Sequence, residues 1–285
     1  MRDSFGRRID YLRLSVTGGC NLRCIYCRPA GEVSCPSPCR APSPAEIVEA
    51  AAEVGITKVR ITGGEPCIRG DLPELVGKIA ATSGIEEVCL TTNGTLLAPM
   101  AGELRAMGLS RVNISIDSLI PERYRAITRG GSLDDALAGL AACKAAGFEN
   151  TKVNCVLIGG VNDGEVDAFD SFAAEQGVEV RFIELMPLGV CADWPRERFV
   201  PAGTAKGHVI APISRPFCST CNRIRVTADG YLKPCLHSGE ELSLRGLSGV
   251  ELVEAVRAGI LAKPKAHTLA DAGSRSLRIM SEIGG

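Results

Sequence analysis

The sequence predicts an α/β protein whose core is a parallel β-sheet curled toward a barrel. Two observations lead to this prediction. Over the first two-thirds of the 285 residues, short apolar runs typical of strands alternate with stretches of helical periodicity, and several of the helical stretches end near a glycine. Strands joined by helices form right-handed parallel units. A hydrophobic content of 45% with 23% charged residues is typical of a globular chain with an ample core.

The expected elements follow one another in a regular order. The six strands are short apolar runs at residues 11–16, 58–62, 87–91, 111–116, 151–157 and 178–183. The helices between them are expected at 44–54, 71–82, 98–107, 133–146 and 165–176, each ending near Gly55, Gly84, Gly108, Gly147 or Gly177. After Met186 the alternation stops, and only one more helix is expected, at 249–262. The expected domains are therefore a partial barrel at residues 1–186 and a C-terminal region at residues 187–285.

One face of the expected strands is polar. Side chains alternate between the two faces of a strand, and the polar face comprises Tyr11, Arg13, Ser15, Lys58, Arg60, Thr62, Asn113, Ser115, Asp117, Lys152, Asn154, Glu179 and Arg181. If the other face packs on the helices, this set points into the barrel. Buried cations need a counter-charge, so we expect an anionic ligand there. The alternatives are that the cations pair with inward Asp and Glu, or that the strand register differs by one residue.

The most informative motif is the triplet Cys20, Cys24 and Cys27. Three thiolates with three and then two intervening residues can hold three irons of one cubane cluster and leave the fourth iron open to a ligand. A structural zinc site usually takes four protein ligands, and a disulfide framework is unusual in a chain of this length. Zinc and inert thiols remain alternatives to the cluster.

A second triplet follows in the C-terminal region at Cys218, Cys221 and Cys235. Zinc competes more strongly here, because His237 could act as a fourth ligand. Arg223 and Arg225 add two cations, either as an exposed strand face or as anion-binding groups. Cys35 and Cys39 lie in a Pro-rich loop at residues 29–44 and are assigned no role.

Several polar motifs follow the expected strands directly, where parallel sheets place their sites. Gly63, Gly64 and Glu65, followed by Pro66, come after the second strand. The glycines let backbone approach a ligand closely, and Glu65 offers a carboxylate to an amino group; an ordinary turn is the alternative. Residues 91–94, 115–117 and 186–187 follow the third, fourth and sixth strands in the same way.

The bulk properties exclude some classes of function. A net charge of −1 gives no general attraction to nucleic acid or to an anionic membrane. There is no run of eighteen apolar residues, and the first residues have no apolar leader segment. Thirteen cysteines in such a chain favour metal binding in the reducing cytoplasm over disulfides.

Taken together, these motifs resemble one family. Residues 3–7 and 11–17, both Cys motifs, residues 227–230 and the final 283–285 are similar to the MoaA family, the radical SAM (S-adenosylmethionine) GTP 3′,8-cyclases of molybdenum cofactor biosynthesis. Many radical SAM enzymes share the first Cys motif and the GGEP turn. The segment from Cys218 to Arg225 and the terminal Gly-Gly are typical of MoaA proteins.

The resemblance implies a partial (β/α)6 radical SAM barrel with a C-terminal auxiliary iron–sulfur cluster region. Two [4Fe–4S] clusters are implied, one on Cys20, Cys24 and Cys27 and one on Cys218, Cys221 and Cys235. The implied SAM contacts are Tyr26, Gly63, Gly64, Glu65, Ser115 and Met186. The implied GTP contacts are Arg13, Arg60, Thr91, Lys152, Arg223 and Arg225, with Lys58 and Arg181 as helpers. The implied catalytic residues are Arg13, Arg223, Arg225, Gly284 and Gly285, the two glycines forming a tail that reaches back to the site.

The implied reaction starts with cleavage of SAM to a 5′-deoxyadenosyl radical. This radical removes hydrogen from C3′ of GTP, and C3′ then bonds to guanine C8 to give 3′,8-cyclo-7,8-dihydro-GTP. Arg side chains and the second cluster help to reduce and protonate the cyclised nucleotide. The implied partners are an electron donor of the reduced flavodoxin or ferredoxin type and a downstream cyclic pyranopterin monophosphate synthase, and a homodimer is compatible with the family.

The chain also departs from the family pattern. Residues 186–217 and the segment after Cys235 are short, the loop at 29–44 is unusual, and Gly18 and Gly19 stand where Asp-Arg is usual. Two alternatives therefore stay open. One is a radical SAM relative with a second cluster that acts on a peptide or another nucleotide. The other is a zinc-stabilised binding protein without catalysis.

Overall fold

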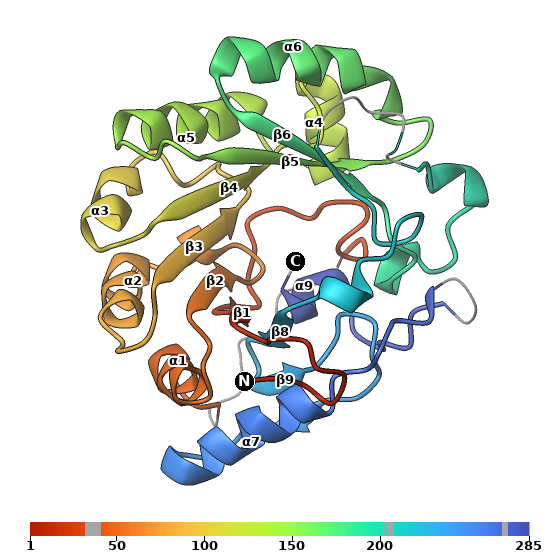
Figure 1. Ribbon diagram of the computed structural model, residues 1–285. Coiled ribbons are helices and arrows are strands. Elements are labelled where there is room, and N and C mark those ends of the chain that lie inside the picture. The colour runs from red at the N-terminus through yellow and green to blue at the C-terminus, as the bar shows by residue number, and fades with distance from the viewer. Residues whose placement is uncertain (32–40, 202, 204–207, 270–272, 285) are drawn as a thin grey trace.

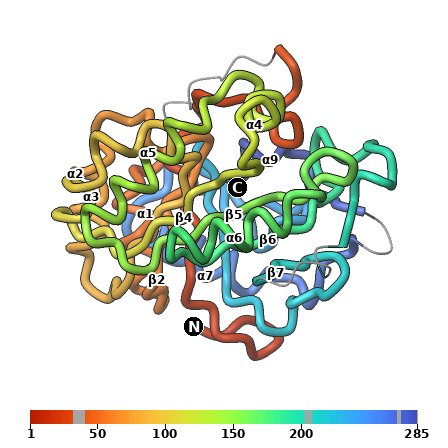
Figure 2. The backbone as a smooth tube through the Cα atoms, turned by 90° about the horizontal axis from the view of Figure 1, so that it is seen from above, coloured from red at the N-terminus to blue at the C-terminus, as the bar shows by residue number. Residues whose placement is uncertain are grey.

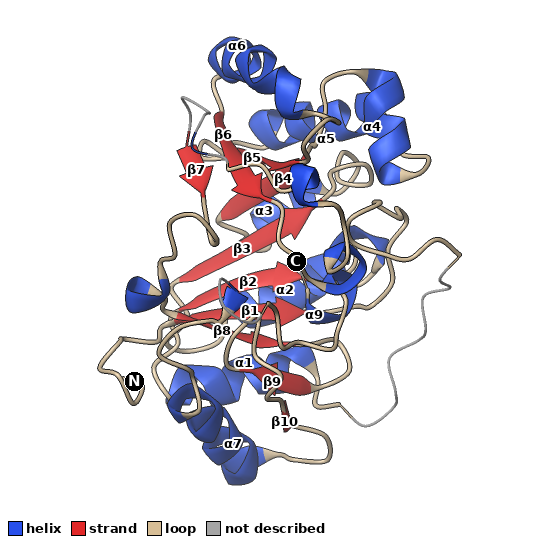
Figure 3. Ribbon diagram, turned by 90° about the vertical axis from the view of Figure 1, so that its right-hand side faces the viewer, coloured by secondary structure: helices blue, strands red, loops and turns tan. Residues whose placement is uncertain are grey.

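The computed structural model describes residues 1–31, 41–201, 203, 208–269 and 273–284. Its centre is one curved β-sheet with helices along the outer face (Figure 1), and Figure 3 shows the strands side by side in a single layer. Seen from above, α1, α2, α3 and α5 gather on one side of the molecule (Figure 2). The order of the strands is β10-β9-β8-β1-β2-β3-β4-β5-β6-β7.

The elements have the following bounds. The strands are β1 (Tyr11–Ser15), β2 (Lys58–Thr62), β3 (Glu87–Thr92), β4 (Arg111–Ser115), β5 (Lys152–Leu157), β6 (Glu179–Glu184), β7 (His208–Ile210), β8 (Arg223–Val226), β9 (Tyr231–Lys233) and β10 (Leu242–Ser243). The helices are α1 (Pro44–Glu53), α2 (Leu72–Ala80), α3 (Ala101–Ala106), α4 (Pro121–Thr128), α5 (Leu133–Ala145), α6 (Val166–Gln176), α7 (Gly249–Leu261) and α9 (Met280–Ile283).

Local sequence accounts for where several helices begin and end. Ser43 caps α1: its Oγ accepts from the backbone N–H of Glu46 at 3.3 Å, and the Glu46 carboxylate accepts from the Ser43 N–H at 2.8 Å. Pro44 then takes the first helical position, where no hydrogen bond is lost. A different helix, α6, ends at Gly177, which adopts the left-handed conformation with φ of 61°.

The sheet is larger than the six strands that the sequence predicts. From β8 through β1 to β6 and β7 all neighbouring strands are parallel, whereas β9 and β10 are antiparallel. The six predicted strands are therefore confirmed, but the prediction that the strand pattern ends at residue 186 is wrong. β7 and β8 add one parallel strand to each side of them. With three and four residues these strands are too short to show a period in the sequence.

Helix α4 was also missed, because it is polar and buries little more than Tyr124 and Ile127. The boundary expected at residues 186 and 187 stays a prediction. Strands from both sides of that boundary belong to the same sheet, since β8 pairs with β1 and β7 with β6.

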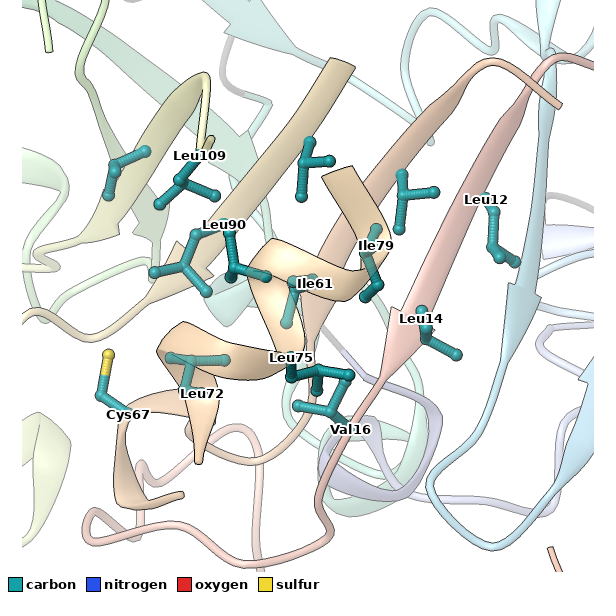
Figure 4. Close-up of a cluster of buried hydrophobic side chains, with 14 of the residues drawn as sticks. Leu12, Leu14, Val16, Ile61, Cys67, Leu72, Leu75, Ile79, Leu90 and Leu109 are labelled. Atoms are coloured by element: carbon teal, nitrogen blue, oxygen red, sulfur yellow. The ribbon is translucent and has the colours of Figure 1, made fainter. Parts of the chain in front are cut away.

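The apolar core fills the space between the convex face of the sheet and the helices. Leu12, Leu14 and Ile61 on the strands are at most 1% exposed and belong to one cluster with Leu72 and Ile79 of α2. Figure 4 shows these side chains between α2 and the first strands. Since side chains alternate along a strand, the residues between them face the concave side. The register predicted for the polar face is thus confirmed.

Within the described ranges, no helix has both the length and the apolar character needed to span a bilayer.

Candidate functional site

A cavity of about 490 Å³ opens on the concave side of the sheet. It brings together all the site residues predicted from the sequence except the terminal glycines. These lining residues are Arg13, Cys20, Cys24, Tyr26, Cys27, Lys58, Arg60, Gly63, Gly64, Glu65, Thr91, Ser115, Lys152, Arg181, Met186, Cys218, Cys221, Arg223, Arg225 and Cys235. The two Cys triplets, about two hundred residues apart in the chain, therefore face one space.

The cysteines divide into two groups by burial. The six cysteines of the triplets are half-buried and line the cavity, whereas Cys67, Cys89, Cys143, Cys155 and Cys191 are buried and do not line it. Cys35 and Cys39 lie outside the described residues. Two groups of three accessible thiols in one enclosed space fit the donor set of two thiolate-bound clusters that each keep one open iron. Among the described residues, no three His, Cys, Asp or Glu form a group that could hold a single metal ion. The assignment of clusters to these cysteines stays a prediction.

The first triplet lies on a loop that α4 supports. Arg23 N–H donates to Thr128 O at 3.1 Å, and Ile25 N–H donates to Ile127 O at 2.9 Å. Within the loop, Cys27 N–H donates to Cys24 O at 2.9 Å. The helix that the sequence did not reveal is therefore the element that holds the loop carrying the first three cysteines.

The two triplets differ in their electrostatic surroundings. Burial and the nearby Asp117 carboxylate raise the pKa of the Cys24 thiol well above its ordinary value. Burial also acts to raise the pKa of Cys221, but the cations Lys263 and Arg223 outweigh it and lower that pKa to about 7. The surroundings of Cys24 thus disfavour its thiolate, whereas the cations beside Cys221 favour the thiolate there.

The GGEP turn packs directly against the start of the first Cys loop. Gly64 N–H donates to Thr17 O, and Glu65 N–H donates to Gly19 O, both at 2.8 Å. A Cβ atom on Gly64 would lie 2.0 Å from Gly19 O. Glycine at this position therefore lets two backbone segments touch, which is a reason in addition to the expected approach of a ligand.

Glu65 is held by the protein on several sides. Its carboxylate accepts from Cys67 N–H at 2.9 Å, from Thr92 Oγ1 at 2.7 Å and from Asn93 N–H at 2.7 Å, and the residue is only 1% exposed. The carboxylate thereby joins the turn after β2 to the end of β3. That it also receives an amino group of a ligand stays a prediction.

The contact between the two loops predicts the effect of a single methyl group. Gly64→Ala is expected to displace the first Cys loop and to lower the iron content of the reconstituted protein by about half, with a loss of stability of about 1–3 kcal/mol from the clash. Iron assay and thermal unfolding measure both effects. Gly70→Ala is the matched control, because a Cβ there meets no atom within 4 Å. Equal iron in both variants would contradict the packing argument.

Asp117 is a site residue that the sequence did not single out for a role. Tyr26 Oη donates to its Oδ2 at 2.6 Å, and Val156 N–H donates to Oδ1 at 2.8 Å. Burial raises the pKa of Asp117 to about 6, although both hydrogen bonds lower it. The carboxylate lines the cavity and fastens Tyr26 of the first Cys loop to the end of β4. Its place directly after a strand was the signal that could have identified it.

The lysines of the polar face are paired with carboxylates. Lys58 Nζ lies 2.5 Å from Glu87, Lys152 pairs with Glu179, and Arg181 Nε lies 2.6 Å from the same Glu179. For these three residues the structure follows the alternative in which inward cations meet inward acids. They still line the cavity and can contact a ligand there.

The arginines are arranged differently. Arg60 donates to Tyr11 Oη at 2.6 Å and to Leu90 O at 2.9 Å, and Arg223 stacks over Phe217 at 5.0 Å. Among the described residues, no ion pair with a carboxylate involves Arg60, Arg223 or Arg225.

The charges of these arginines act on one another. Burial and the neighbouring cation Arg225 hold the pKa of Arg13 well below its usual value, and burial with Arg223 lowers the pKa of Arg225 to about 10. An anion in the cavity would relieve this repulsion. The arginine side of the cavity therefore fits a polyanionic ligand.

The C-terminal segment enters the cavity region. Helix α9 lies inside the curve of the sheet (Figure 1), and Arg225 Nη1 donates to Gly284 O at 2.7 Å. Gly284 has φ of 87°, and a Cβ on it would lie 2.7 Å from Thr62 Oγ1. Only glycine fits this close approach to β2. Gly285 lies outside the described residues.

Other residues reach the cavity with no motif to mark them. They include Arg111, Lys263, His267, Met280 and Ser281, and His237, which the sequence marked only as a possible zinc ligand, also lines the cavity. Burial and the nearby His267, Arg225 and Lys233 lower the pKa of His237 to about 3, so this imidazole is neutral near pH 7. Its Nδ1 lies 3.3 Å from Ser274 Oγ. Its proposed part in a zinc site stays an untested alternative.

Comparison with known families gives two matches that together cover most of the chain. The model of the radical SAM superfamily matches residues 14–173, and the model of Molybdenum Cofactor Synthesis C matches residues 202–269.

Curated relatives match along the full length. Proteins of Alkaliphilus oremlandii and Heliobacterium modesticaldum, both named GTP 3′,8-cyclase, are each 42% identical to this chain over 323 and 329 residues, with 100% of both chains covered. Both alignments exceed the 285 residues of this chain, so these relatives have residues that it lacks.

Solved structures share the fold. SuiB of Streptococcus suis bound to its precursor peptide SuiA has a TM-score of 0.67 at 14% identity, covering 96% of this chain and 76% of SuiB. The anSMEcpe protein with bound AdoMet has a TM-score of 0.61 at 18% identity, covering 86% of this chain and 80% of its own. At such low sequence identities this similarity shows a shared fold and nothing about function.

Proposed function

The chain belongs to the radical SAM superfamily and, within it, to the family whose curated members are named GTP 3′,8-cyclase, and on that premise we propose that it converts GTP to 3′,8-cyclo-7,8-dihydro-GTP. The reaction removes the hydrogen at C3′ of the ribose and joins C3′ to C8 of guanine. The product is the first intermediate of molybdopterin biosynthesis, and the enzyme is a lyase.

The first triplet and the loops around it form the proposed cofactor site. A [4Fe–4S] cluster with SAM supplies a 5′-deoxyadenosyl radical when both are bound. Cys20, Cys24 and Cys27 hold the cluster, and the Gly63–Gly64 turn keeps their loop against β2. Tyr26, Ser115 and Met186 complete the SAM pocket, in which Asp117 holds Tyr26 by a 2.6 Å hydrogen bond.

The arginine side of the cavity is the proposed GTP site. Arg13, Arg60, Arg223 and Arg225 bind the nucleotide, and charge-assisted hydrogen bonds to phosphate offset their mutual repulsion. Thr91 near the end of β3 and Lys152 at the start of β5 add contacts to the nucleotide, with Lys58 and Arg181 as helpers. The walls of the cavity orient the ribose toward the SAM site and exclude water from the reacting atoms.

A second [4Fe–4S] cluster is proposed on Cys218, Cys221 and Cys235. Support comes from three half-buried thiols that line the same cavity as the first triplet and from the lowered pKa of Cys221, about 7. The pairing of β8 with β1 supports a position of this triplet beside the proposed GTP site. Cys218, Cys221 and Cys235 would hold the cluster there, and the cluster would supply an iron without a protein ligand for the guanine. Gly284 and Gly285 complete this end of the site.

The partners follow from the chemistry. A single-electron donor such as a reduced flavodoxin or ferredoxin must supply the cluster, and a cyclic pyranopterin monophosphate synthase must consume the product. The proposed localisation is the cytoplasm, because its reducing conditions keep thiols free to bind iron–sulfur clusters. A homodimer is compatible with this proposal.

The shared cavity of both Cys triplets and the arginines is the observation that carries the proposal. Its test is anaerobic reconstitution followed by incubation with SAM, dithionite and GTP. We expect a brown protein with about eight irons per chain and formation of 5′-deoxyadenosine together with the cyclised nucleotide, both measured by mass spectrometry.

Two outcomes would point elsewhere. Deoxyadenosine with all GTP recovered intact would favour a relative that acts on a peptide or another nucleotide. A colourless protein with stoichiometric zinc would favour a binding protein without catalysis.

A further inference from the structure

A short segment after α7 runs along the second Cys triplet, and Lys263 is its central residue. The side chain is buried, with the residue only 3% exposed, and Nζ donates to Arg223 O at 2.7 Å and to Pro234 O at 3.0 Å. Arg223 comes two residues after Cys221, and Pro234 directly precedes Cys235. One ammonium group therefore joins the two chain segments that carry these cysteines.

Arg7 makes a corresponding connection to the third cysteine. Its Nη1 donates to Cys218 O at 2.8 Å and to Lys265 O at 3.0 Å, and its Nη2 donates to Pro264 O at 2.7 Å. Arg7 comes from the N-terminal turn and Lys263 from the C-terminal region, yet both meet at residues 263–265. Together they fasten all three cysteine segments to one another.

The two cations differ in whether a neighbouring carboxylate balances their charge. Arg7 Nε lies 2.6 Å from Oδ2 of the buried Asp3, so the Asp3 carboxylate balances the charge of Arg7 locally. Among the described residues Lys263 takes part in no ion pair with a carboxylate. Its hydrogen-bond partners are two neutral carbonyl groups and the side chain of Cys221. Lys263 and Cys221 both line the cavity, so the ammonium group stands beside one of the three thiols.

We propose that Lys263 is a positioning residue for the second iron–sulfur cluster, which holds Cys221 and Cys235 at the spacing the cluster needs and makes that cluster easier to reduce through its unbalanced positive charge. Reduction adds negative charge to the cluster, and a fixed cation in a site of low dielectric stabilises the reduced form. The proposal rests on the proposed second cluster.

The main test replaces Lys263 by an apolar side chain of similar length. In Lys263→Met, the ratio of reduced to oxidised second cluster at a fixed potential should fall about tenfold, which for one electron is a shift of about 59 mV to lower potential. An EPR-monitored redox titration of the reconstituted holoenzyme measures this, with and without SAM, because only the first cluster responds to SAM. The first cluster should keep its potential.

Three further variants, one of them a control, separate charge from geometry. Lys265→Met is the matched control, because this side chain is exposed on the same segment, and it should behave like the parent protein. Arg7→Lys keeps the positive charge opposite Asp3 but loses the guanidinium group that bridges Cys218 O, Pro264 O and Lys265 O, so it should speed the loss of iron to a chelator without moving the potential. Lys263→Arg keeps the charge and should keep the potential within about twofold in the reduced-to-oxidised ratio.

Each outcome decides one question. If Lys263→Met loses only the second cluster, the positioning part holds, and Lys263→Arg then tests the charge. If Lys263→Met matches Lys265→Met in potential and in iron retention, the inference is overturned while the proposed function stands. If the parent protein itself binds a single cluster, the proposed second cofactor fails instead.

Discussion

Cys24→Ser is expected to abolish formation of 5′-deoxyadenosine from SAM, by at least about three orders of magnitude or about 4 kcal/mol of lost transition-state stabilisation. Cys24 is the middle cysteine of the first triplet, and burial with the nearby Asp117 makes its thiolate unfavourable unless a cation is bound. A serine oxygen is a poor substitute for a thiolate that binds iron. Iron content should fall by about four per chain in the same preparation.

Cys143→Ala is the control for this experiment. Cys143 is fully buried in α5 and does not line the cavity, so its replacement should leave deoxyadenosine formation within about twofold of the parent protein while costing about 1 kcal/mol of stability. If Cys24→Ser kept its iron and its turnover, or if Cys143→Ala lost them equally, the first triplet would not be the cluster site.

Arg225→Gln is expected to lower kcat/KM for GTP by about 10- to 150-fold. The loss of one charged hydrogen bond to a phosphate or base oxygen is worth about 1.5–3 kcal/mol. Arg225 lines the cavity from β8, also donates to Gly284 O, and carries a charge that its neighbour Arg223 disfavours. Steady-state kinetics and nucleotide binding by calorimetry measure the effect. Both clusters should remain loaded.

Arg215→Gln is the matched control, because Arg215 is an exposed arginine that does not line the cavity. Its kinetics should equal those of the parent protein. Loss of the second cluster in Arg225→Gln, with GTP affinity unchanged in the protein that remains, would make Arg225 a structural residue and would remove the nucleotide site from this side of the cavity.

The family resemblance seen in the sequence is confirmed by the comparisons, and the reasons lie in local patterns. The spacing of Cys20, Cys24 and Cys27 can be recognised without knowledge of the fold, because the three residues are close together in the sequence. The alternation along β1 and β2 likewise allowed the inward face to be predicted, since a strand has a period of two. Six strands and five helices between them followed from the same kind of pattern.

The partners of these residues could not be read from local patterns. Lys58 and Lys152 are paired with acids on neighbouring strands, so the inward cations are less uniform than the sequence suggested. Gly64 packs against the backbone of Gly19, so the absence of a side chain there serves this contact as well as any approach of a ligand. Both facts depend on which strands become neighbours, and that choice is made by the packing of the whole sheet.

By itself the sequence determined the chemistry available to this protein: two triplets of thiols, a set of inward arginines, and a chain of parallel strands whose ends carry polar motifs. Only the tertiary structure decided that this chemistry meets in one place. Pairing of β8 with β1 carries the second triplet to the first cavity, and the long-range contacts of Arg7 and Lys263 hold its three cysteines together. Local periodicity cannot encode such contacts, because their free energy comes from burial and hydrogen bonds between residues that lie from 29 positions (Lys263 and Pro234) to 211 positions (Arg7 and Cys218) apart in the chain.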